Sequence, residues 1–318
     1  MWNRRQFLMS ASLIGLSGSL GRSATLPTAP HLHFPRAPRA RLSVASWPFR
    51  AFMESPSNPY RDPSKPGMDL TAFPAMVVRE FGLHHIEPMS AHFPSTDPRY
   101  LDQLRTACAK AGVSIVDVAV GAQGSFYDPD AAKRRLAVEF AQHWVDVAVA
   151  AGSPSVRVHI GGVRGVRPSV HLAAESLSRV AEHGARRNVV VNLENDNLVS
   201  EDAFFIVKVI DRVGSPWLHA LPDFGNSALT GEPAFNYDAL TVMFRHAYNI
   251  SHMKDSETGP GGKLYTVNVA RIFRIAQASG YRGYFSMEWD TVGDPYAGTR
   301  RLIRESLENL ERERAAAP

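Results

Sequence analysis

Short apolar and β-branched runs alternate along the chain with longer segments whose apolar residues recur at helical spacing. The helical spacing is found in residues 68–81, 97–111, 128–151, 168–187, 201–213, 237–246 and 267–279 and from 295 onward. The strand-like runs are residues 41–49, 85–89, 113–120, 155–160, 188–194, 218–222, 248–251 and 284–287. Eight strands that alternate with eight helices predict an α/β fold of the (β/α)8 TIM-barrel type.

Residues that favour helix caps mark several of these boundaries. The segment 97–111 begins with Asp97 and Pro98 and is followed by Gly112, so the side chain of Asp97 is expected to cap this helix.

No Gly-x-Gly-x-x-Gly pattern follows the first strand, which argues against the alternative of an open doubly wound sheet. The length of 318 residues, leader included, suits one large barrel.

The first 40 residues are predicted to lie outside the barrel. Arg4 and Arg5 precede an apolar, uncharged run at residues 8–20, a pattern that resembles a twin-arginine export signal. We therefore expect a signal peptide at 1–24, a proline-rich linker at 25–40 and a single barrel domain at 41–318. The expected location is the periplasm or another exported site, with the twin-arginine export machinery as a partner. An ordinary secretory signal and an uncleaved anchor are the alternatives.

Composition narrows the functional classes further. The formal net charge of +4 is small for this length, and basic groups such as Lys133-Arg134-Arg135 are scattered over predicted helices. They are interpreted as solvated helix faces, so no nucleic-acid partner is expected. The single cysteine, Cys108, excludes an internal disulfide and is predicted to be a core thiol.

Four strand-like runs end next to a residue that can bind a metal: Glu194, Asp223, His252 and Glu288. The steps between them are 29, 29 and 36 residues (223 − 194, 252 − 223 and 288 − 252), and each step has about the length of one strand, one helix and two loops. Equivalent strand ends of a barrel converge on one mouth, so these side chains are expected to meet there. Carboxylates with one imidazole suit Mn²⁺, Mg²⁺ or Co²⁺ better than a structural zinc. The alternative is that each residue only forms hydrogen bonds at its strand end.

The order Glu, Asp, His, Glu on strands five to eight resembles the sugar phosphate isomerase/epimerase family, which has a xylose-isomerase-like barrel. The resemblance covers residues 41–313 and is carried by Asn192-Leu193-Glu194-Asn195, Pro222-Asp223-Phe224-Gly225-Asn226, Ser251-His252-Met253-Lys254-Asp255 and Ser286-Met287-Glu288. In the ketose 3-epimerases of this family, the strand-five and strand-eight glutamates bind the metal and move the substrate proton. The resemblance implies both roles for Glu194 and Glu288. Those epimerases usually have a histidine where this chain has Asn226, so the substrate and the reaction type stay open.

Other strand ends supply candidates for substrate binding, each with a structural alternative. Glu87 ends the second strand and can contact a substrate hydroxyl or form a salt bridge. His159, on the fourth strand, can face the barrel mouth or serve as a core histidine. Lys254 can contact an oxyanion or be solvated. The predicted substrate-binding set is Glu87, His159, Asn226 and Lys254.

Two loops and two aromatic residues are further candidates. The loop at 50–67 is long and rich in proline, and loops this long are often functional. Trp47 and Phe49, which close the first strand, can stack on a sugar ring, although packing inside the barrel is favoured for both. The sequence Gly259-Pro260-Gly261-Gly262 is expected to be either a mobile lid or a surface turn.

The expected function is that of a divalent-metal-dependent sugar isomerase or epimerase. Such an enzyme abstracts a proton next to the carbonyl of a keto-sugar and passes through an enediolate. Mn²⁺ is the expected ion, with Mg²⁺, Co²⁺ or Zn²⁺ as alternatives. The alternative functions are a metal-dependent lyase or hydrolase that cleaves 3-keto-glycosides by β-elimination, and a non-catalytic sugar-binding barrel. Nuclease-like hydrolysis of the endonuclease IV type is disfavoured, because the strand ends lack a clear set of additional histidine ligands.

The expected partner is a small sugar or glycoside. Export favours an unphosphorylated one, because sugar phosphates are mostly cytoplasmic. The choice among epimerase, isomerase and lyase stays open at this point. So does the oligomeric state, for which a homo-oligomer is one alternative.

We predict that the double substitution Arg4→Lys/Arg5→Lys retains the precursor in the cytoplasm. The physical motive for folding before export is metal choice, since copper and zinc outcompete manganese at most nitrogen and oxygen sites. Cell fractionation and immunoblotting measure the exported share, with Arg22→Lys as a charge-preserving control near the end of the leader. Unchanged export of the double variant would contradict a twin-arginine signal.

Overall fold

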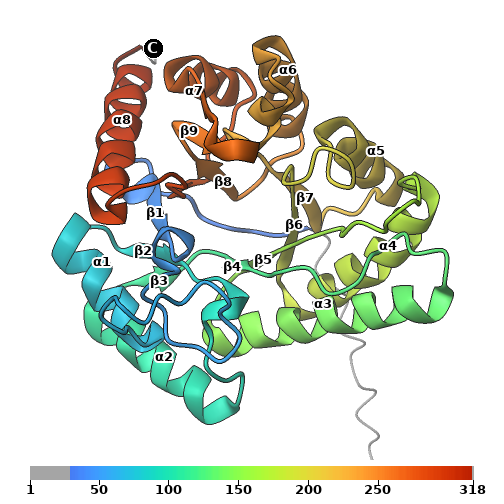
Figure 1. Cartoon of the computed structure of the whole chain (residues 1–318), viewed down its shortest axis with the longest axis horizontal. Helices are drawn as coiled ribbons and strands as arrows, with labels where there is room; N and C mark the ends of the chain where they lie inside the picture. Colours follow the sequence, from blue (N-terminus) through green and yellow to red (C-terminus); the bar gives the residue numbers. More distant parts are fainter. Residues whose placement is uncertain (1–28, 317–318) are drawn as a thin grey trace, which may run out of the picture.

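The computed structural model describes residues 29–316, and in this range parallel strands form a barrel that helices surround (Figure 1). One arc of the barrel has the strand order β3-β2-β1-β11-β8, and the other has the order β4-β5-β6-β7. These strands are β1 (Leu42–Ala45), β2 (His85–Glu87), β3 (Ser114–Ile115), β4 (Val118–Ala119), β5 (Ser155–Val158), β6 (Val190–Glu194), β7 (Leu218–Leu221), β8 (Ile250–Met253) and β11 (Tyr284–Met287). All pairs within both arcs are parallel, so the predicted (β/α)8 barrel is confirmed.

The third predicted strand is the place where the two arcs meet. The run 113–120 was expected to be continuous, but the structure splits it into β3, which pairs with β2, and β4, which pairs with β5. The ladder breaks because the chain changes its neighbour between Ile115 and Val118. Isolated parallel bridges join the arcs at the two seams: Met89 with Ala119 at one, and Ala220 with Ala247 and Asp223 with His252 at the other.

The helices lie outside the strands and bury one face each. They are α1 (Phe73–Phe81), α2 (Pro98–Ala111), α3 (Ala131–Ala151), α4 (Val170–Arg187), α5 (Ala203–Val213), α6 (Pro233–Phe244), α7 (Val269–Ala278) and α8 (Pro295–Ala316). Cys108 is buried on α2, as predicted. The side chain of Asp97 forms no capping hydrogen bond, so that expectation is wrong. Helix α2 still begins there, because Pro98 presets the first-turn φ and the Asp97 carbonyl accepts a hydrogen bond from Leu101 N at 3.1 Å.

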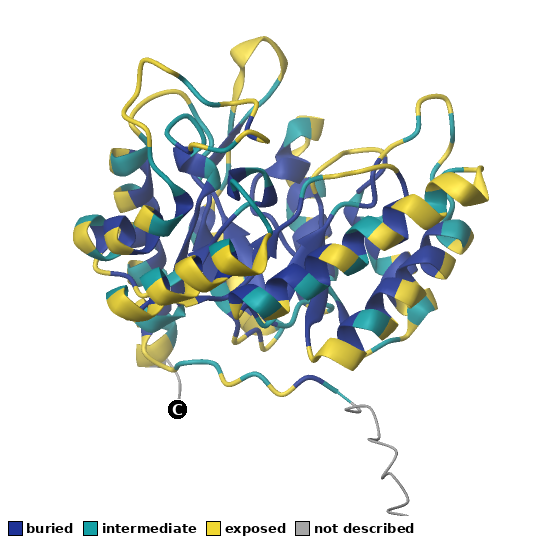
Figure 2. Cartoon of the chain, turned by 90° about the horizontal axis from the view of Figure 1, so that it is seen from below, coloured by how far each residue is buried: buried dark blue, intermediate teal, exposed yellow. Residues whose placement is uncertain are grey.

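The described part of the segment before β1 packs along one end of the barrel (Figure 2). The hydroxyl group of Tyr248 donates to the carbonyl of Pro30 at 3.1 Å and accepts from Leu32 N at 3.0 Å. The ring of Phe34 meets the rings of Tyr248 and Tyr284 edge-on, at centroid distances of 5.5 and 6.0 Å. Residues 30–34 therefore cover the barrel end at which the strands begin. The predicted signal peptide, 1–24, lies outside the described residues.

An antiparallel hairpin after β8 stands above the opposite end of the barrel. Its strands are β9 (Ser256–Thr258) and β10 (Leu264–Thr266), and the Gly259-Pro260-Gly261-Gly262 sequence forms its tip. Gly261 and Gly262 have φ values of 70° and 77°, a region in which only glycine is free of steric cost. No helix in the range 29–316 is long and apolar enough to cross a membrane.

The centre of the barrel is polar, although barrels of this kind are usually filled by branched apolar side chains. Asp117 and Ser155 are in hydrogen-bonding contact, Asn192 Nδ2 donates to Asp117 Oδ1 at 3.2 Å, and Asn249 Nδ2 donates to Ser155 Oγ at 2.8 Å. All four residues are buried. Burial, and then the negative charge of Glu87, raises the pKa of Asp117 to about 7.

We predict that Asp117→Asn makes stability less dependent on pH. The carboxyl pKa is about 7 in the folded protein and about 3.9 in an unfolded chain. Between these values the folded state holds a proton that the unfolded state has lost, so the stability of the parent protein declines as the pH rises. Relative to the parent, the variant should gain several degrees in Tm between pH 5 and pH 8.

Thermal unfolding by circular dichroism at the two pH values measures this difference. Asp102→Asn, an exposed change on α2, is the matched control and should give the same Tm difference at both values. An Asp117→Asn variant whose Tm difference from the parent does not change with pH would show that this carboxyl titrates normally.

Candidate metal centre

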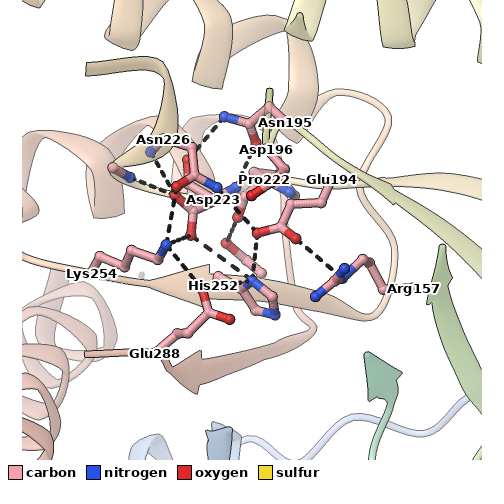
Figure 3. Close-up of polar contacts among 12 residues, drawn as sticks. Arg157, Glu194, Asn195, Asp196, Pro222, Asp223, Asn226, His252, Lys254 and Glu288 are labelled. Carbon is pink, nitrogen blue, oxygen red and sulfur yellow. Dashed lines mark hydrogen bonds and ion pairs between the residues drawn. The ribbon is translucent and has the colours of Figure 1, made fainter. Parts of the chain in front are cut away.

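Glu194, Asp223, His252 and Glu288 meet at the end of the barrel where the strands finish (Figure 3). Each offers one ligand atom, and these four atoms lie within 4.8 Å of one another. Glu194 ends β6, Asp223 follows β7, His252 lies on β8 and Glu288 follows β11. The structure therefore brings together the side chains that the strand spacing selected. We call these four residues the metal-ligand cluster, and their role as ligands remains a prediction.

His252 lies at the middle of this cluster. Its Nδ1 is 2.7 Å from Glu194 Oε1 and 3.2 Å from Glu288 Oε2. Its Nε2 is 2.8 Å from Glu87 Oε1. A carboxylate can only accept, so both ring nitrogens donate here. Burial lowers the pKa of His252, but Glu288, Glu87 and Glu194 raise it by more, to well above its usual value. A divalent ion would take the place of the proton on Nδ1, whereas Nε2 keeps its proton toward Glu87. An outer carboxylate commonly fixes the orientation of a metal-binding histidine in this way.

Asp223 shows most directly that the cluster fits a cation. Its Oδ1 accepts hydrogen bonds from the backbone of Gly225 and Asn226 at 2.9 and 2.7 Å. Its Oδ2 is buried and has no hydrogen-bond partner among the described residues, and the Lys254 ammonium is 3.4 Å away. Three carboxylates with one imidazole suit a hard or borderline divalent ion. The three carboxylates and the imidazole therefore fit the expected divalent metal ion.

The ionisation of the cluster depends on the positive groups around it. Burial raises the pKa of Asp223 to about 8, against the opposing effect of Lys254. Burial also raises the pKa of Glu194, but His252 and Arg157 together lower it by more. The pKa of this carboxyl therefore lies well below its usual range. In the same way, His252 and Lys254 outweigh burial and lower the pKa of Glu288 to about 2.

Lys254 and Asn226 close one side of the cluster. The Lys254 ammonium is buried, 3.1 Å from Glu288 Oε2 and 2.9 Å from Glu257 Oε2, and it donates to Asn226 Oδ1 at 3.0 Å. The alternative of a solvated lysine is therefore wrong. Asn226 Nδ2 in turn donates to Glu194 Oε1 at 3.4 Å. Asn226 thus connects a cluster carboxylate to the ammonium group.

Arg157 and Glu201 hold the other side, and sequence reasoning assigned neither of them to the site. Arg157 Nε is 3.1 Å from Glu194 Oε2, and its guanidinium also contacts His159 Nε2. His159 Nδ1 lies 3.1 Å from Glu201 Oε1, which also accepts from the backbone of Ile160 at 2.6 Å. Glu201 stood at the start of a predicted helix and gave no signal beyond that. These contacts lead from the pocket rim to Glu194.

A pocket of about 670 Å³ opens above the cluster. Its lining includes the four predicted substrate-binding residues, Glu87, His159, Asn226 and Lys254. Trp47 also lines it, whereas Phe49 packs among Phe73, Phe81 and Tyr296 inside the fold. A wider groove of about 1160 Å³ on the outside, along α1 and α2, contains none of the candidate residues.

Comparisons with known proteins agree with this architecture. A family model described as a xylose isomerase-like TIM barrel matches residues 76–313. No match was found among curated proteins. The structure of an L-ribulose 3-epimerase is similar, with a TM-score of 0.63 and 19% identity over 87% of this chain and 98% of that chain.

Two further solved structures have the same fold. A xylose isomerase-like TIM barrel protein from Mycobacterium smegmatis, in complex with magnesium, has a TM-score of 0.61 and 18% identity over 85% of this chain and 97% of that chain. The 3-keto-D-glucoside 4-epimerase from E. coli has a TM-score of 0.57 and 16% identity over 77% of this chain and 94% of that chain. At these low sequence identities, the similarity shows a shared fold only.

We predict that Glu87→Gln lowers the affinity for Mn²⁺ by about 10–100-fold, the usual effect of losing an outer partner of a metal-binding histidine. The neutral amide makes the His252 imidazole less basic and no longer dictates which of its nitrogens is protonated. Isothermal titration of the metal-free protein with MnCl₂ measures the affinity. The exposed change Asp102→Asn, a carboxylate-to-amide control on α2, should leave it unchanged. Parent-like affinity in Glu87→Gln would remove this role from Glu87.

Proposed function

The chain belongs to the xylose isomerase-like TIM-barrel family, and on this premise we propose that it is a divalent-metal-dependent sugar isomerase or epimerase. The proposed reaction begins with removal of a proton next to the carbonyl of a keto-sugar. The observation that carries the proposal is the placement of two buried carboxylates at the same nitrogen of one imidazole. Glu194 Oε1 and Glu288 Oε2 lie 2.7 and 3.2 Å from His252 Nδ1, at the floor of the pocket.

The two glutamates can act as an acid/base pair. Their pKa values lie well below the usual range, so both are ionised at neutral pH and either can accept the α-proton. When that C–H bond breaks, its electron pair moves into the carbonyl group and leaves an enediolate. A bound divalent ion supplies Lewis-acid stabilisation of this charge. Return of a proton from the opposite side inverts the carbon centre, and no further reactant is consumed.

Lys254 places a proton donor beside Glu288, whose carboxylate is ionised before the reaction. Its ammonium is 3.1 Å from Glu288 Oε2, within reach for passing a proton to that carboxylate. Glu257 and Asn226 hold the same ammonium at 2.9 and 3.0 Å, so it stays aimed at the cluster. Glu194 lies on the other side beside Arg157, which carries no transferable proton at neutral pH. This asymmetry favours Glu194 as the base and Glu288 as the acid.

Cleavage of a keto-glycoside is the second candidate function. It shares the first step, after which the enediolate electrons expel a substituent on the β-carbon, the C–O bond breaks and the leaving oxygen takes up a proton. The extent of the pocket supports this candidate. Its lining continues past the metal-ligand cluster to Trp47 and Tyr60, which leaves room for a leaving group. A non-catalytic sugar-binding barrel is disfavoured, because it would have no need for two buried carboxylates beside the imidazole.

The remaining parts of the proposal concern the metal, the partner and the location. Mn²⁺ is proposed as the ion, with Mg²⁺, Co²⁺ and Zn²⁺ as alternatives, and the donor chemistry of the cluster supports it. A small sugar or glycoside is the proposed substrate. Export through the twin-arginine pathway is proposed from Arg4 and Arg5, which lie outside the described residues.

We predict that Glu194→Gln and Glu288→Gln each lower kcat by at least about 10²–10⁴-fold, the usual contribution of general acid–base catalysis. Metal affinity should fall less, because a glutamine keeps one oxygen ligand. The assay is conversion of keto-sugars and 3-keto-glucosides by Mn²⁺-loaded protein in D₂O, with α-proton exchange followed by NMR. Glu194→Gln should abolish exchange, whereas Glu288→Gln should retain part of it.

The surface change Glu182→Gln on α4 is the matched control and should keep parent activity. Near-full turnover in both site variants would refute the proposed proton transfer.

A further inference from the structure

The pocket has two unlike walls. The part of the chain from β5 to β11 lines it mainly with charged and polar side chains, and these surround the metal-ligand cluster. The part from β1 to β4 lines the opposite side. We use the term apolar wall for six of its residues: Trp47, Pro59, Tyr60, Met89, Ala91 and Ala122. Glu87 is the one charged residue that this part of the chain adds to the lining, and it lies at the floor against His252.

Trp47 is held in the apolar wall by contacts at its ring. The Arg50 guanidinium lies over the indole, 4.3 Å from the ring centroid, and pairs with Asp290 Oδ1 at 2.7 Å. The Tyr60 ring stands nearly perpendicular to the indole, with the centroids 5.0 Å apart. The cation–π contact and the ring pair fix both aromatic side chains relative to each other.

The loop that carries Tyr60 is fixed by one buried amide. Asn58 Nδ2 donates to the carbonyls of Arg50 and Met53 at 2.7 and 2.8 Å, and Asn58 Oδ1 accepts from Tyr60 N at 3.0 Å. Tyr60 nevertheless keeps 51% of its surface exposed. The loop thus presents a preformed aromatic surface to the pocket, and its own packing leaves that surface uncovered.

The size of the pocket calls for a substrate with two parts. A volume of about 670 Å³ is within the range of about 300–1,000 Å³ typical of sites for drug-sized ligands. A single keto-sugar on the polar side would leave the apolar wall in contact with water. A second sugar there can stack one face on Trp47, but the hydroxyl groups at its edge would lie beside Met89 and Ala91 with few partners, which is costly for polar groups. An aromatic or apolar group fits that side better.

We propose that the substrate is a keto-sugar that carries an aromatic or apolar aglycone, and that the apolar wall binds this aglycone. The inference rests on the proposed function, because it places the sugar over Glu194 and Glu288. The two parts of the ligand then match the two walls: hydroxyl and carbonyl oxygens face the charged side, and the aglycone covers Tyr60 and Trp47.

Binding tests the inference without any turnover. The probes are three β-D-glucosides that differ in the aglycone, which is methyl, phenyl or a second glucose. They are methyl β-D-glucoside, phenyl β-D-glucoside and cellobiose, none of which has a ketone. Titration of the Mn²⁺-loaded protein, followed by tryptophan fluorescence or calorimetry, should show that the phenyl glucoside binds at least about tenfold more tightly than the methyl glucoside. Equal affinities would overturn the inference, and so would tighter binding of cellobiose than of the phenyl glucoside.

Two variants locate the aglycone. Tyr60→Ser removes the exposed ring, and Ala122→Asp places a charge at an exposed position of the same wall. Each should reduce the phenyl-to-methyl affinity ratio several-fold, with an unchanged Tm as the check on folding. Leu136→Ser, a 60% exposed apolar position on α3 outside the pocket, is the matched control and should keep the parent ratio. A parent ratio in both wall variants would overturn the assignment.

A final comparison separates this inference from the proposed function. Methyl and phenyl 3-keto-β-D-glucosides are incubated with the protein in D₂O, and α-proton exchange is followed by NMR. Exchange with both substrates at equal kcat/KM would support the proton-transfer function and overturn the aglycone site. A phenyl preference in binding, with no exchange on either ketone, would support the aglycone site and overturn the proposed function. The expected result is exchange on both, with kcat/KM at least about tenfold higher for the phenyl compound.

Discussion

The barrel mouth depends on compensation of buried negative charge. Three carboxylates of the metal-ligand cluster are almost fully buried within a few ångströms of one another, where they repel and have lost water. His252 lies between them, Lys254 approaches from one side and Arg157 from the other. Each cation is held by a further carboxylate outside the cluster: Glu87, Glu257 and Glu201, the last through His159. The site is therefore a network, in which every member sets the orientation or ionisation of its neighbours.

Charged and apolar side chains line different halves of the pocket. The charged groups come from the chain between β5 and β11, while β1 to β4 and their loops line the pocket with mostly apolar side chains. Glu87 is the exception, and it crosses from the apolar half to complete the contacts of His252. The closed barrel makes this possible, because β1 pairs with β11 and β2 lies next to β1. A barrel with a polar centre also tolerates groups such as Asp117 and Asn192 below the site.

Most of the fold could be predicted from local patterns, and the exceptions have local explanations. β6, which ends at Glu194, and β11, which ends just before Glu288, lie where the apolar runs placed them, because side-chain burial in a barrel repeats with each βα unit. The split of the third strand was missed, since a run of apolar residues does not reveal where a strand changes its neighbour. Asp97 has the residue type of a cap and forms no capping bond, because residue preference does not decide side-chain geometry.

The sequence by itself determined the eight βα repeats and their order and, through the repeated strand ends, the four residues that cluster at the barrel mouth. Those signals are periodic and local, so a single chain displays them. Only the tertiary structure decided which groups surround the cluster. Glu87 meets His252 across 165 positions of sequence, and Arg50 meets Asp290 across 240. Such pairs arise when closure of the barrel brings distant loops to one mouth, and spacing along the chain carries no record of them.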